Sequence, residues 1–323
     1  MVQCELINDP TIKPSKDFNA KTDAETVAAG HEKDIARMIF HRTYAERKEI
    51  ADYYDKNTSS QSGKSFIKAI IASSSETSLD ALYIMALVPA DEILANCLHD
   101  NIHHKHSPEV GAIEEIVCAN DKGMKDLINK KYQTRFGKSV EDELARFKED
   151  DKAYQDVIQK YCWKGLCQDK KITPEDADKE AKALRNISPK KKQTDFKNKL
   201  IELLDKYCEL DLKQIFQKYR QGDDGIDGAV GDAFEVDRQR RAYYYLVRAI
   251  EDICQLYAFE LRHAADDASH MHLDKINRIV LSRCERDLFC INKAYRDDGY
   301  DTFTSRLAVI IYRIFAHSYT AVA

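Results

Sequence analysis

The apolar positions of the chain recur four times in the same order. Each of four segments holds an isoleucine with a tyrosine four residues later, and apolar residues stand fifteen, twelve and eleven positions before that isoleucine. This spacing describes one apolar face on each of two consecutive helices. Such a recurrence predicts an all-α protein built from four helical units. The four sets are Ile35, Met38, Ile39, Ile50 and Tyr54; Ile113, Ile116, Val117, Ile128 and Tyr132; Leu200, Leu203, Leu204, Ile215 and Tyr219; and Ile276, Ile279, Val280, Ile291 and Tyr295.

The spacing of the tyrosines sets the size of the units. Successive tyrosines lie 78, 87 and 76 residues apart, which leaves room for about five short helices in each unit. We predict a tail at residues 1–20 and units at residues 21–89, 90–168, 173–250 and 251–323. The helices predicted for the second unit are Ala90–Asn101, Pro108–Ala119, Asp121–Phe136, Val140–Lys148 and Lys152–Tyr161.

Two further segments of the third unit have distinct compositions. The glycine-rich segment Gln221–Gly231 predicts a turn region, because glycine is the commonest residue at turns. The aromatic stripe Tyr243–Tyr245 precedes Leu246 and Ile250, and this pattern predicts the core side of a fifth helix.

Composition narrows the possible functions. Eleven glycines and six prolines in 323 residues are too few for a turn-rich β-sandwich or barrel. Fifty basic and 55 acidic residues give a net charge of −5, so no general basic field indicates a nucleic-acid binder. No apolar run approaches the ~20 residues of a membrane span, and the first residues lack the features of a secretory signal. We therefore expect any membrane contact to be peripheral.

Nine cysteines are scattered along the chain without close pairs. This scattering argues against a disulfide framework or a zinc module, and it predicts buried thiols in a reducing cytosol. Cys4 is an exception, because it lies in the predicted tail, where its thiol could react.

The four units resemble the annexin repeat. The resemblance rests on Ile39–Tyr54, Tyr132–Leu144 and Arg278–Ile291, and it is weaker in the third unit. With its short first loop and many cysteines, the chain is most similar to the alpha-giardins, which are divergent protozoan annexins. The resemblance implies four repeats of about five helices in a curved disc. It also implies a peripheral protein at the cytoplasmic side of the plasma membrane or on the cytoskeleton, binding acidic phospholipid through calcium.

The loops that would hold calcium depart from the annexin pattern. In that family a Gly-x-Gly-Thr turn and a later acidic side chain supply oxygen ligands, since glycine lets backbone carbonyls face the cation. No loop of this chain keeps both glycines, although the first loop keeps Gly30. The acids nearest the expected position are Glu76, Glu149 and Glu235. We expect calcium to bind weakly or atypically, with Gly30 and these three glutamates as candidate ligands and with no site in the fourth unit.

Two of the same loops are basic, and the resemblance places both on the membrane-facing side. A cation near an anionic bilayer contributes roughly 1 kcal/mol, so we interpret these loops as lipid contacts. For the histidines, a structural or surface role and a transition-metal site at His99 and His103 remain open; for the lysines, a merely solvated loop remains open. The candidate lipid-binding residues are His103, His104, Lys105 and His106 in the second unit, and Lys190, Lys191 and Lys192 in the third.

Histidine gives these loops an expected pH dependence. Its ordinary pKa is about 6.5, so binding to anionic lipid should strengthen as the pH falls from about 7.5 to about 5.5. Salt should weaken that binding, because exposed charges are screened within about 10 Å at ~0.1 M ionic strength.

Two functions of different classes fit the sequence. The first is a peripheral phospholipid-binding protein that links membrane and cytoskeleton. The second is a cytoskeletal protein-interaction scaffold without lipid binding. We do not expect an enzyme, because the chain has no glycine-rich phosphate loop, nucleophile elbow or His-Glu-x-x-His motif.

Overall fold

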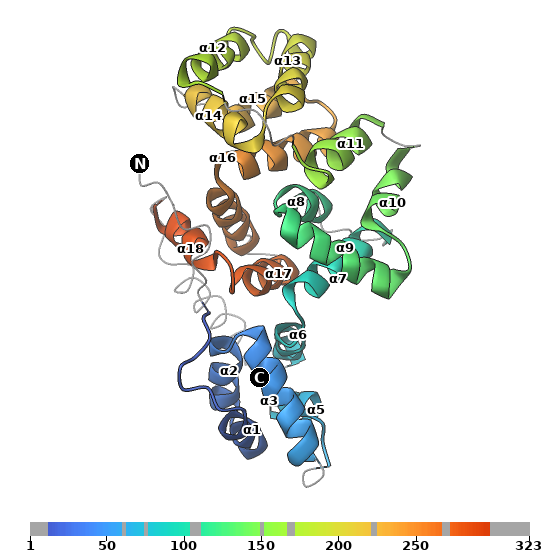
Figure 1. The fold of residues 1–323 in the computed structure, drawn as a ribbon, viewed down its shortest axis with the longest axis vertical. Helices are drawn as coiled ribbons and strands as arrows, with labels where there is room; N and C mark the ends of the chain where they lie inside the picture. The colour runs from blue at the N-terminus through green and yellow to red at the C-terminus, as the bar shows by residue number, and fades with distance from the viewer. Residues whose placement is uncertain are drawn as a thin grey trace, which may run out of the picture. The chain divides into compact units, whose positions relative to one another are not determined.

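A computed structural model describes residues 12–59, 63–73, 77–103, 111–148, 152–166, 172–220, 225–266 and 272–297. Every regular element within these residues is a helix, which confirms the predicted all-α class (Figure 1). No helix in the described part of the chain has the length and apolarity needed to cross a membrane.

The first repeat contains five described helices, and capping explains where several of them begin and end. Asn19 caps the first helix with its side chain, and Gly30 ends it at a φ of 74°. Thr43 and Glu46 form a reciprocal capping box at the start of the third helix. The helices are α1 (Ala20–Ala29), α2 (Glu32–His41), α3 (Tyr44–Asn57), α5 (Phe66–Ser73) and α6 (Thr77–Ala86).

The second repeat agrees closely with the helices predicted for it. The largest difference is the predicted Pro108–Ala119, which begins at Ala112, after residues that lie outside the described ranges. Its last helix continues as a π-helix, a form that is rare in proteins. The elements are α7 (Ala90–His103), α8 (Ala112–Cys118), α9 (Lys122–Phe136), α10 (Val140–Leu144) with the 3₁₀ turn Ala145–Lys148, and α11 (Lys152–Asp156) with the π-helix Val157–Trp163.

The third repeat corrects the turn predicted for Gln221–Gly231. Residues 221–224 lie outside the described ranges, but α15 begins at Ile226 and includes two of the glycines. Its buried residues recur with helical spacing, so their packing outweighs the cost of about 1 kcal/mol for each glycine inside a helix. The helices are α12 (Pro174–Arg185), α13 (Gln193–Lys206), α14 (Glu209–Tyr219), α15 (Ile226–Ala233) and the first part of α16 (Asp237–Asp266).

Helix α16 bends at Asp252, which has the non-helical backbone angles φ −161° and ψ 104°. The Asp252 side chain accepts hydrogen bonds from the backbone N–H groups of Cys254 and Gln255, so it caps the helix that follows the bend. Tyr243 and Tyr245, before the bend, are buried as predicted for a fifth helix. Two more helices are described after α16: α17 (Leu273–Arg283) and α18 (Leu288–Asp297).

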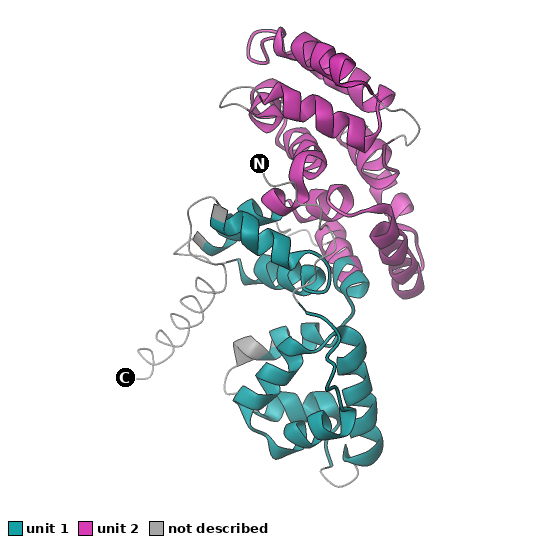
Figure 2. Ribbon diagram, turned by 60° about the vertical axis from the view of Figure 1, so that its left-hand side comes forward, with its two compact units in different colours: residues 1–94, 257–323 teal, residues 95–256 magenta. Residues whose placement is uncertain are grey.

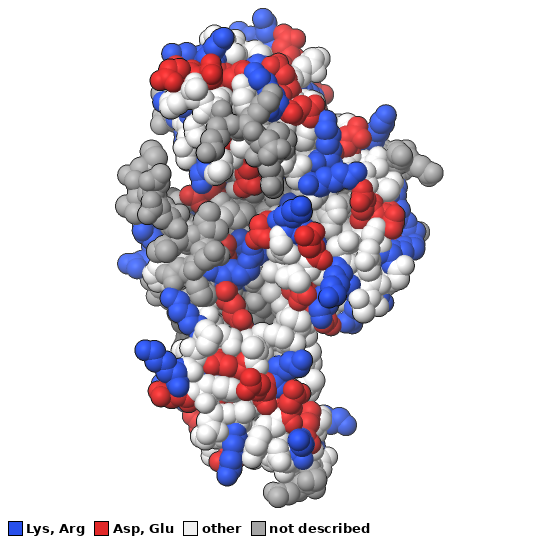
Figure 3. Space-filling model, viewed as in Figure 1, with Lys and Arg blue, Asp and Glu red and all other residues white. Residues whose placement is uncertain are grey.

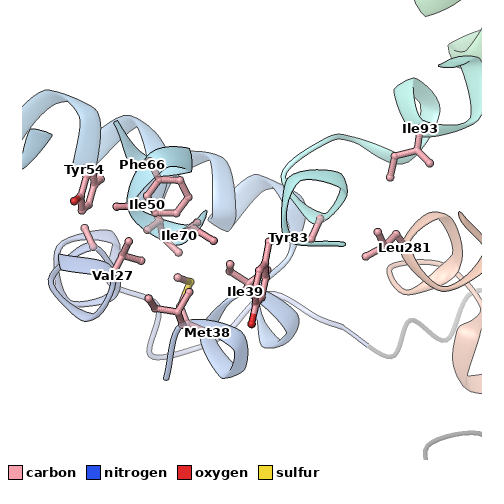
Figure 4. Close-up of a cluster of buried hydrophobic side chains, with 14 residues drawn as sticks. Val27, Met38, Ile39, Ile50, Tyr54, Phe66, Ile70, Tyr83, Ile93 and Leu281 are labelled. Carbon is pink, nitrogen blue, oxygen red and sulfur yellow. The ribbon is translucent and has the colours of Figure 1, made fainter. Parts of the chain in front are cut away.

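The recurring apolar positions form the core. Of the twenty residues in the four sets, all are buried except Ile113 and Val280, which are partly buried. In each repeat the upstream positions lie on the second helix and the Ile–Tyr pair on the third, as the spacing predicts. Figure 4 shows this core in the first repeat, where Val27, Met38, Ile50 and Tyr54 converge between α1, α2 and α3.

The chain divides into two compact units (Figure 2): residues 1–94 with 257–323, and residues 95–256. In the first unit, the start of α3 is joined to the segment after α17. The backbone N–H of Tyr44 donates to Glu285, and the Arg47 guanidinium lies 3.2 Å from the same carboxylate. The first and fourth repeats are therefore joined by a largely buried ion pair, because only 4% of the Arg47 side chain is exposed.

The second unit corrects the prediction that all cysteines are thiols. Cys118 at the end of α8 and Cys162 in the π-helix form a disulfide, although 44 residues separate them. Sequence spacing could not indicate this pair, because the packing of α8 against the π-helix brings the two residues together. Cys254 of the second unit and Cys290 of the first are each disulfide-bonded as well. Cys284 keeps a buried thiol, and burial raises its pKa to about 11.

Candidate functional site

The loop between α12 and α13 carries the three lysines singled out in the sequence. The backbone N–H groups of Lys191 and Lys192 both donate to the carbonyl of Ser188, at 3.2 Å and 2.8 Å, which folds the loop into a turn. All three lysine side chains are exposed, that of Lys190 to 76%. The turn therefore presents a compact group of cations at the start of α13.

A second segment lies against this loop. The ammonium of Lys190 is 3.7 Å from Asp232, and the Gln193 side-chain amide donates to the Asp232 carbonyl at 3.3 Å. Exposed Glu235 joins the three lysines, Gln193 and the first turn of α13 around an open pocket of about 520 Å³. The structure thus brings Glu235 and the lysine loop together. From the sequence, Glu235 was predicted as a calcium ligand and the lysines as lipid contacts.

The lysines of this pocket oppose the binding of a calcium ion. Calcium takes six to eight oxygen ligands, usually including several carboxylates. Here the ammonium of Lys190 already pairs with Asp232, and two more lysines share the pocket with Glu235. Among the described residues, no group of three or more His, Cys, Asp or Glu side chains is arranged to hold a metal ion.

The phenylalanine ring at Phe234 fixes the segment that carries Glu235. It stacks on Tyr243 with ring centroids 4.3 Å apart, and the ammonium of Lys197 lies 5.0 Å from its centroid. Phe234 itself is only 3% exposed. This aromatic anchor holds the neighbouring Glu235 at the surface, beside the lysine loop.

The described histidines of the second repeat have partners within that repeat. The His103 ring lies 3.1 Å from Glu143, which also accepts Arg146 and Lys138. Burial raises the pKa of Glu143, but hydrogen bonds from Arg146 and Lys138 outweigh burial and leave the pKa below its ordinary value. The His99 ring stacks on Phe136 at 3.7 Å between centroids. Both histidines thus contribute to packing, and His104, Lys105 and His106 lie outside the described residues.

The remaining candidate ligands are only partly described. Gly30 ends α1, and its N–H donates to the Val27 carbonyl, as expected for a helix-ending glycine. Glu76 and Glu149 lie outside the described residues. Asp232 and Gln193, which tie the loop to its neighbour, were not singled out in the sequence, and only the fold relates them.

Comparison with known proteins supports the sequence resemblance. No family model matches the chain. The curated annexin-like protein RJ4 of Fragaria ananassa is 25% identical over 295 residues, which cover 88% of this chain and 89% of that protein. Annexin A1 of Sus scrofa is 24% identical over 287 residues, covering 89% and 80%. The chain therefore resembles annexins over most of its length.

Solved annexin structures share its fold. Chicken annexin V in complex with Zn²⁺ superposes with a TM-score of 0.78 at 19% identity, covering 93% of this chain and 94% of that one. Calcium-bound alpha-1 giardin superposes with a TM-score of 0.69 at 16% identity, covering 90% and 92%. The chain therefore shares its fold with annexin and alpha-giardin structures.

The lysine loop is a local feature of this protein. Over the face shown in Figure 3, basic and acidic side chains are interspersed without a broad area of one sign. The sequence has the same balance, with 50 basic and 55 acidic residues. Attraction to an anionic surface must therefore come from local groups such as this loop.

Proposed function

We propose that this annexin-like protein is a peripheral protein that binds acidic phospholipid, and that Lys191 and Lys192 contact the headgroups without calcium. Annexins in general bind phospholipid in a calcium-dependent way and are non-enzymatic binding proteins. The observation that carries the proposal is the turn at Lys190–Lys192, whose side chains line the pocket beside Glu235.

The electrostatics of the loop support this assignment. Lys190 is partly neutralised by Asp232, whereas no ion pair among the described residues involves Lys191 or Lys192. Each basic side chain near an anionic membrane contributes about 1 kcal/mol. The two lysines together therefore contribute about 2 kcal/mol, which corresponds to roughly thirtyfold in affinity.

The test is sedimentation with phosphatidylserine vesicles in the presence of a calcium chelator. Replacing Lys191 and Lys192 with glutamine should weaken binding about thirtyfold at low salt. The matched control replaces exposed Lys130 and Lys179, which lie on α9 and α12, and should change binding less than about threefold. Equal effects of the two double variants would refute the role of the loop.

The finer parts of the proposal concern calcium, location and partner. We propose that the protein binds calcium only weakly or atypically. We also propose that it acts at the cytoplasmic face of the membrane, where it links the membrane to a cytoskeletal protein. The support is the altered calcium loops and the sequence resemblance to alpha-giardins. A scaffold without lipid binding is the alternative outcome: it would leave the protein in the supernatant with and without calcium while it still sediments with cytoskeletal filaments.

A further inference from the structure

A second pocket lies in the first repeat, along the groove between α1 and α2. It has a volume of about 510 Å³, which is within the range of small-molecule sites. Asp34, Arg37 and His41 line it from α2, and Thr26 lines it from α1. These α2 residues are spaced by three and four positions, so they share one face of the helix, away from its buried face.

Arg42 is held in place at one end of this groove. Its Nε donates to Asp23 at 2.7 Å and its Nη2 donates to the second oxygen of Asp23 at 3.2 Å. The guanidinium also lies over the Phe18 ring, 5.7 Å from the centroid. Its Nη1 group makes no hydrogen bond among the described residues, so one edge of a fixed guanidinium remains available.

The groove also holds cationic and hydrogen-bonding groups that the fold does not use. Arg37 and His41 are exposed, and neither forms an ion pair or side-chain hydrogen bond among the described residues. Met38 lines the same pocket and is 7% exposed, because its other side packs into the core (Figure 4). The groove therefore has a firm apolar floor beneath a set of donors.

The acidic side chains decide which anion fits. Asp23 is neutralised by Arg42, but Asp34 is exposed and would repel a densely charged polyanion. A ligand with both phosphate and hydroxyl groups satisfies the whole set. Arginine matches phosphate oxygens with paired N–H donors, while the carboxylate of Asp34 and the hydroxyl of Thr26 accept hydrogen bonds from hydroxyl groups.

We propose that the groove lined by Arg37, His41 and Arg42 binds a phosphorylated polyol, either free in solution or as a lipid headgroup. This site is separate from the lysine loop, so it goes beyond the proposed function and does not rest on it. Arg37 and Arg42 contact the phosphate, His41 donates a further hydrogen bond, and Asp34 selects for hydroxyl groups.

The first arm of the test uses isothermal titration with an inositol monophosphate. Arg37→Gln should weaken binding about tenfold, which corresponds to one charged hydrogen-bonding partner. Asp34→Asn should strengthen the binding of inorganic phosphate, titrated in parallel, about threefold, because it removes a repulsive charge and inorganic phosphate has no polyol hydroxyls for Asp34 to select. The control is Lys33→Gln, an exposed α2 residue outside the pocket, with a change below about twofold.

The second arm distinguishes the source of the ligand. It measures binding to vesicles of neutral lipid with and without phosphatidylinositol phosphate. If Arg37→Gln weakens binding in the titration, the ligand is a free polyol phosphate. If it weakens binding only to the vesicles, the ligand is a lipid headgroup. His41→Gln should weaken binding in the same assay as Arg37→Gln. Circular dichroism and thermal melting check that each variant is folded.

Two results would overturn the proposal: no binding in either arm, or equal losses for Arg37→Gln and Lys33→Gln. Neither result touches the lysine loop, because phosphatidylserine binding is read with the Lys191 and Lys192 variants. The two proposals therefore fail separately.

Discussion

The first and third repeats share one apolar pattern but place their polar chemistry differently. In the first repeat, α1 ends at Ala29 and α2 begins at Glu32, so only two residues connect them. In the third repeat, α12 ends at Arg185 and α13 begins at Gln193, and the seven-residue connection carries the lysines. The short connection leaves its unpaired charges on helix faces along a groove, whereas the long one presents them on a turn. The apolar positions fix the helices, and the loop is free to diverge.

The two repeats also stabilise their helices with different buried polar groups. Arg47 of the first repeat donates to the backbone carbonyls of Ile39 and Arg42 and pairs with Glu285. Glu180 of the third repeat accepts the ammonium groups of Lys199 and Lys206. Arg47 is almost fully buried, while the Glu180 network reaches the surface. Four predictions, from the largest expected effect to the smallest, test this contrast.

Replacing Arg47 with glutamine should have the largest effect on stability. The change removes the cation that the backbone carbonyls of Ile39 and Arg42 and the carboxylate of Glu285 share. The free energy of unfolding should therefore fall by about 3 kcal/mol. Thermal and urea unfolding measure the loss. The matched control, Arg37→Gln at an exposed position of α2, should cost below about 0.5 kcal/mol. A similarly small loss for both variants would mean that Arg47 does not anchor the first repeat.

Glu180→Gln should destabilise the third repeat by about 2 kcal/mol at neutral pH, discounted for the partly exposed Lys206. Burial raises the pKa of Glu180, but hydrogen bonds from Lys199, Lys206 and Tyr207 outweigh it and lower the pKa to about 2. The folded pKa lies below the ordinary 4.5, so this stabilisation is full above about pH 4.5 and is lost as the pH falls through about 2.

The measurement compares wild type and Glu180→Gln at about pH 6 and at about pH 2.5. The difference in unfolding free energy should shrink in acid. If the penalty were the same at both values, the charged form of Glu180 would not be the stabilising one.

Helix caps should give smaller effects of opposite sign in the two repeats. Thr43→Ala removes the capping box of α3 and should cost about 1 kcal/mol. Lys192 occupies the N-cap of α13 without a side-chain hydrogen bond, so Lys192→Asn should stabilise by about 0.5 kcal/mol. The same change should weaken vesicle binding, since it removes a cation. Melting curves measure the stability of Lys192→Asn, and sedimentation with vesicles measures its binding. A stabilised variant with unaltered binding would show that Lys192 does not contact the lipid.

Lys190→Ala should have the smallest effect on stability. The Lys190–Asp232 pair is exposed, and such pairs contribute below about 1 kcal/mol. Removing the ammonium leaves Asp232 and Glu235 facing one cation fewer, so calcium affinity at this loop should rise about threefold. Calorimetric titration with calcium measures the change, with Lys179→Ala on α12 as the control. An unchanged affinity would show that the lysine does not oppose calcium there.

Several features were predictable from residue pattern because they depend on local periodicity. The twelve upstream positions and the four Ile–Tyr pairs could be assigned to helix faces without any knowledge of the fold, because burial of one face requires that spacing. The α15 helix was wrongly predicted as a turn. Glycine content is a local preference, and the packing of Ile226, Ala229 and Val230 outweighs it.

The sequence by itself determined the helical class, the fourfold recurrence and the lysines of the third loop, because these follow from residue order over a few turns of chain. Only the tertiary structure decided which groups meet. It paired Cys118 with Cys162, placed Asp232 and Glu235 beside the lysines, and set Arg42 on Asp23 at the edge of a groove. Such contacts depend on how helices distant in sequence pack against one another. This packing leaves no periodic signal in the sequence.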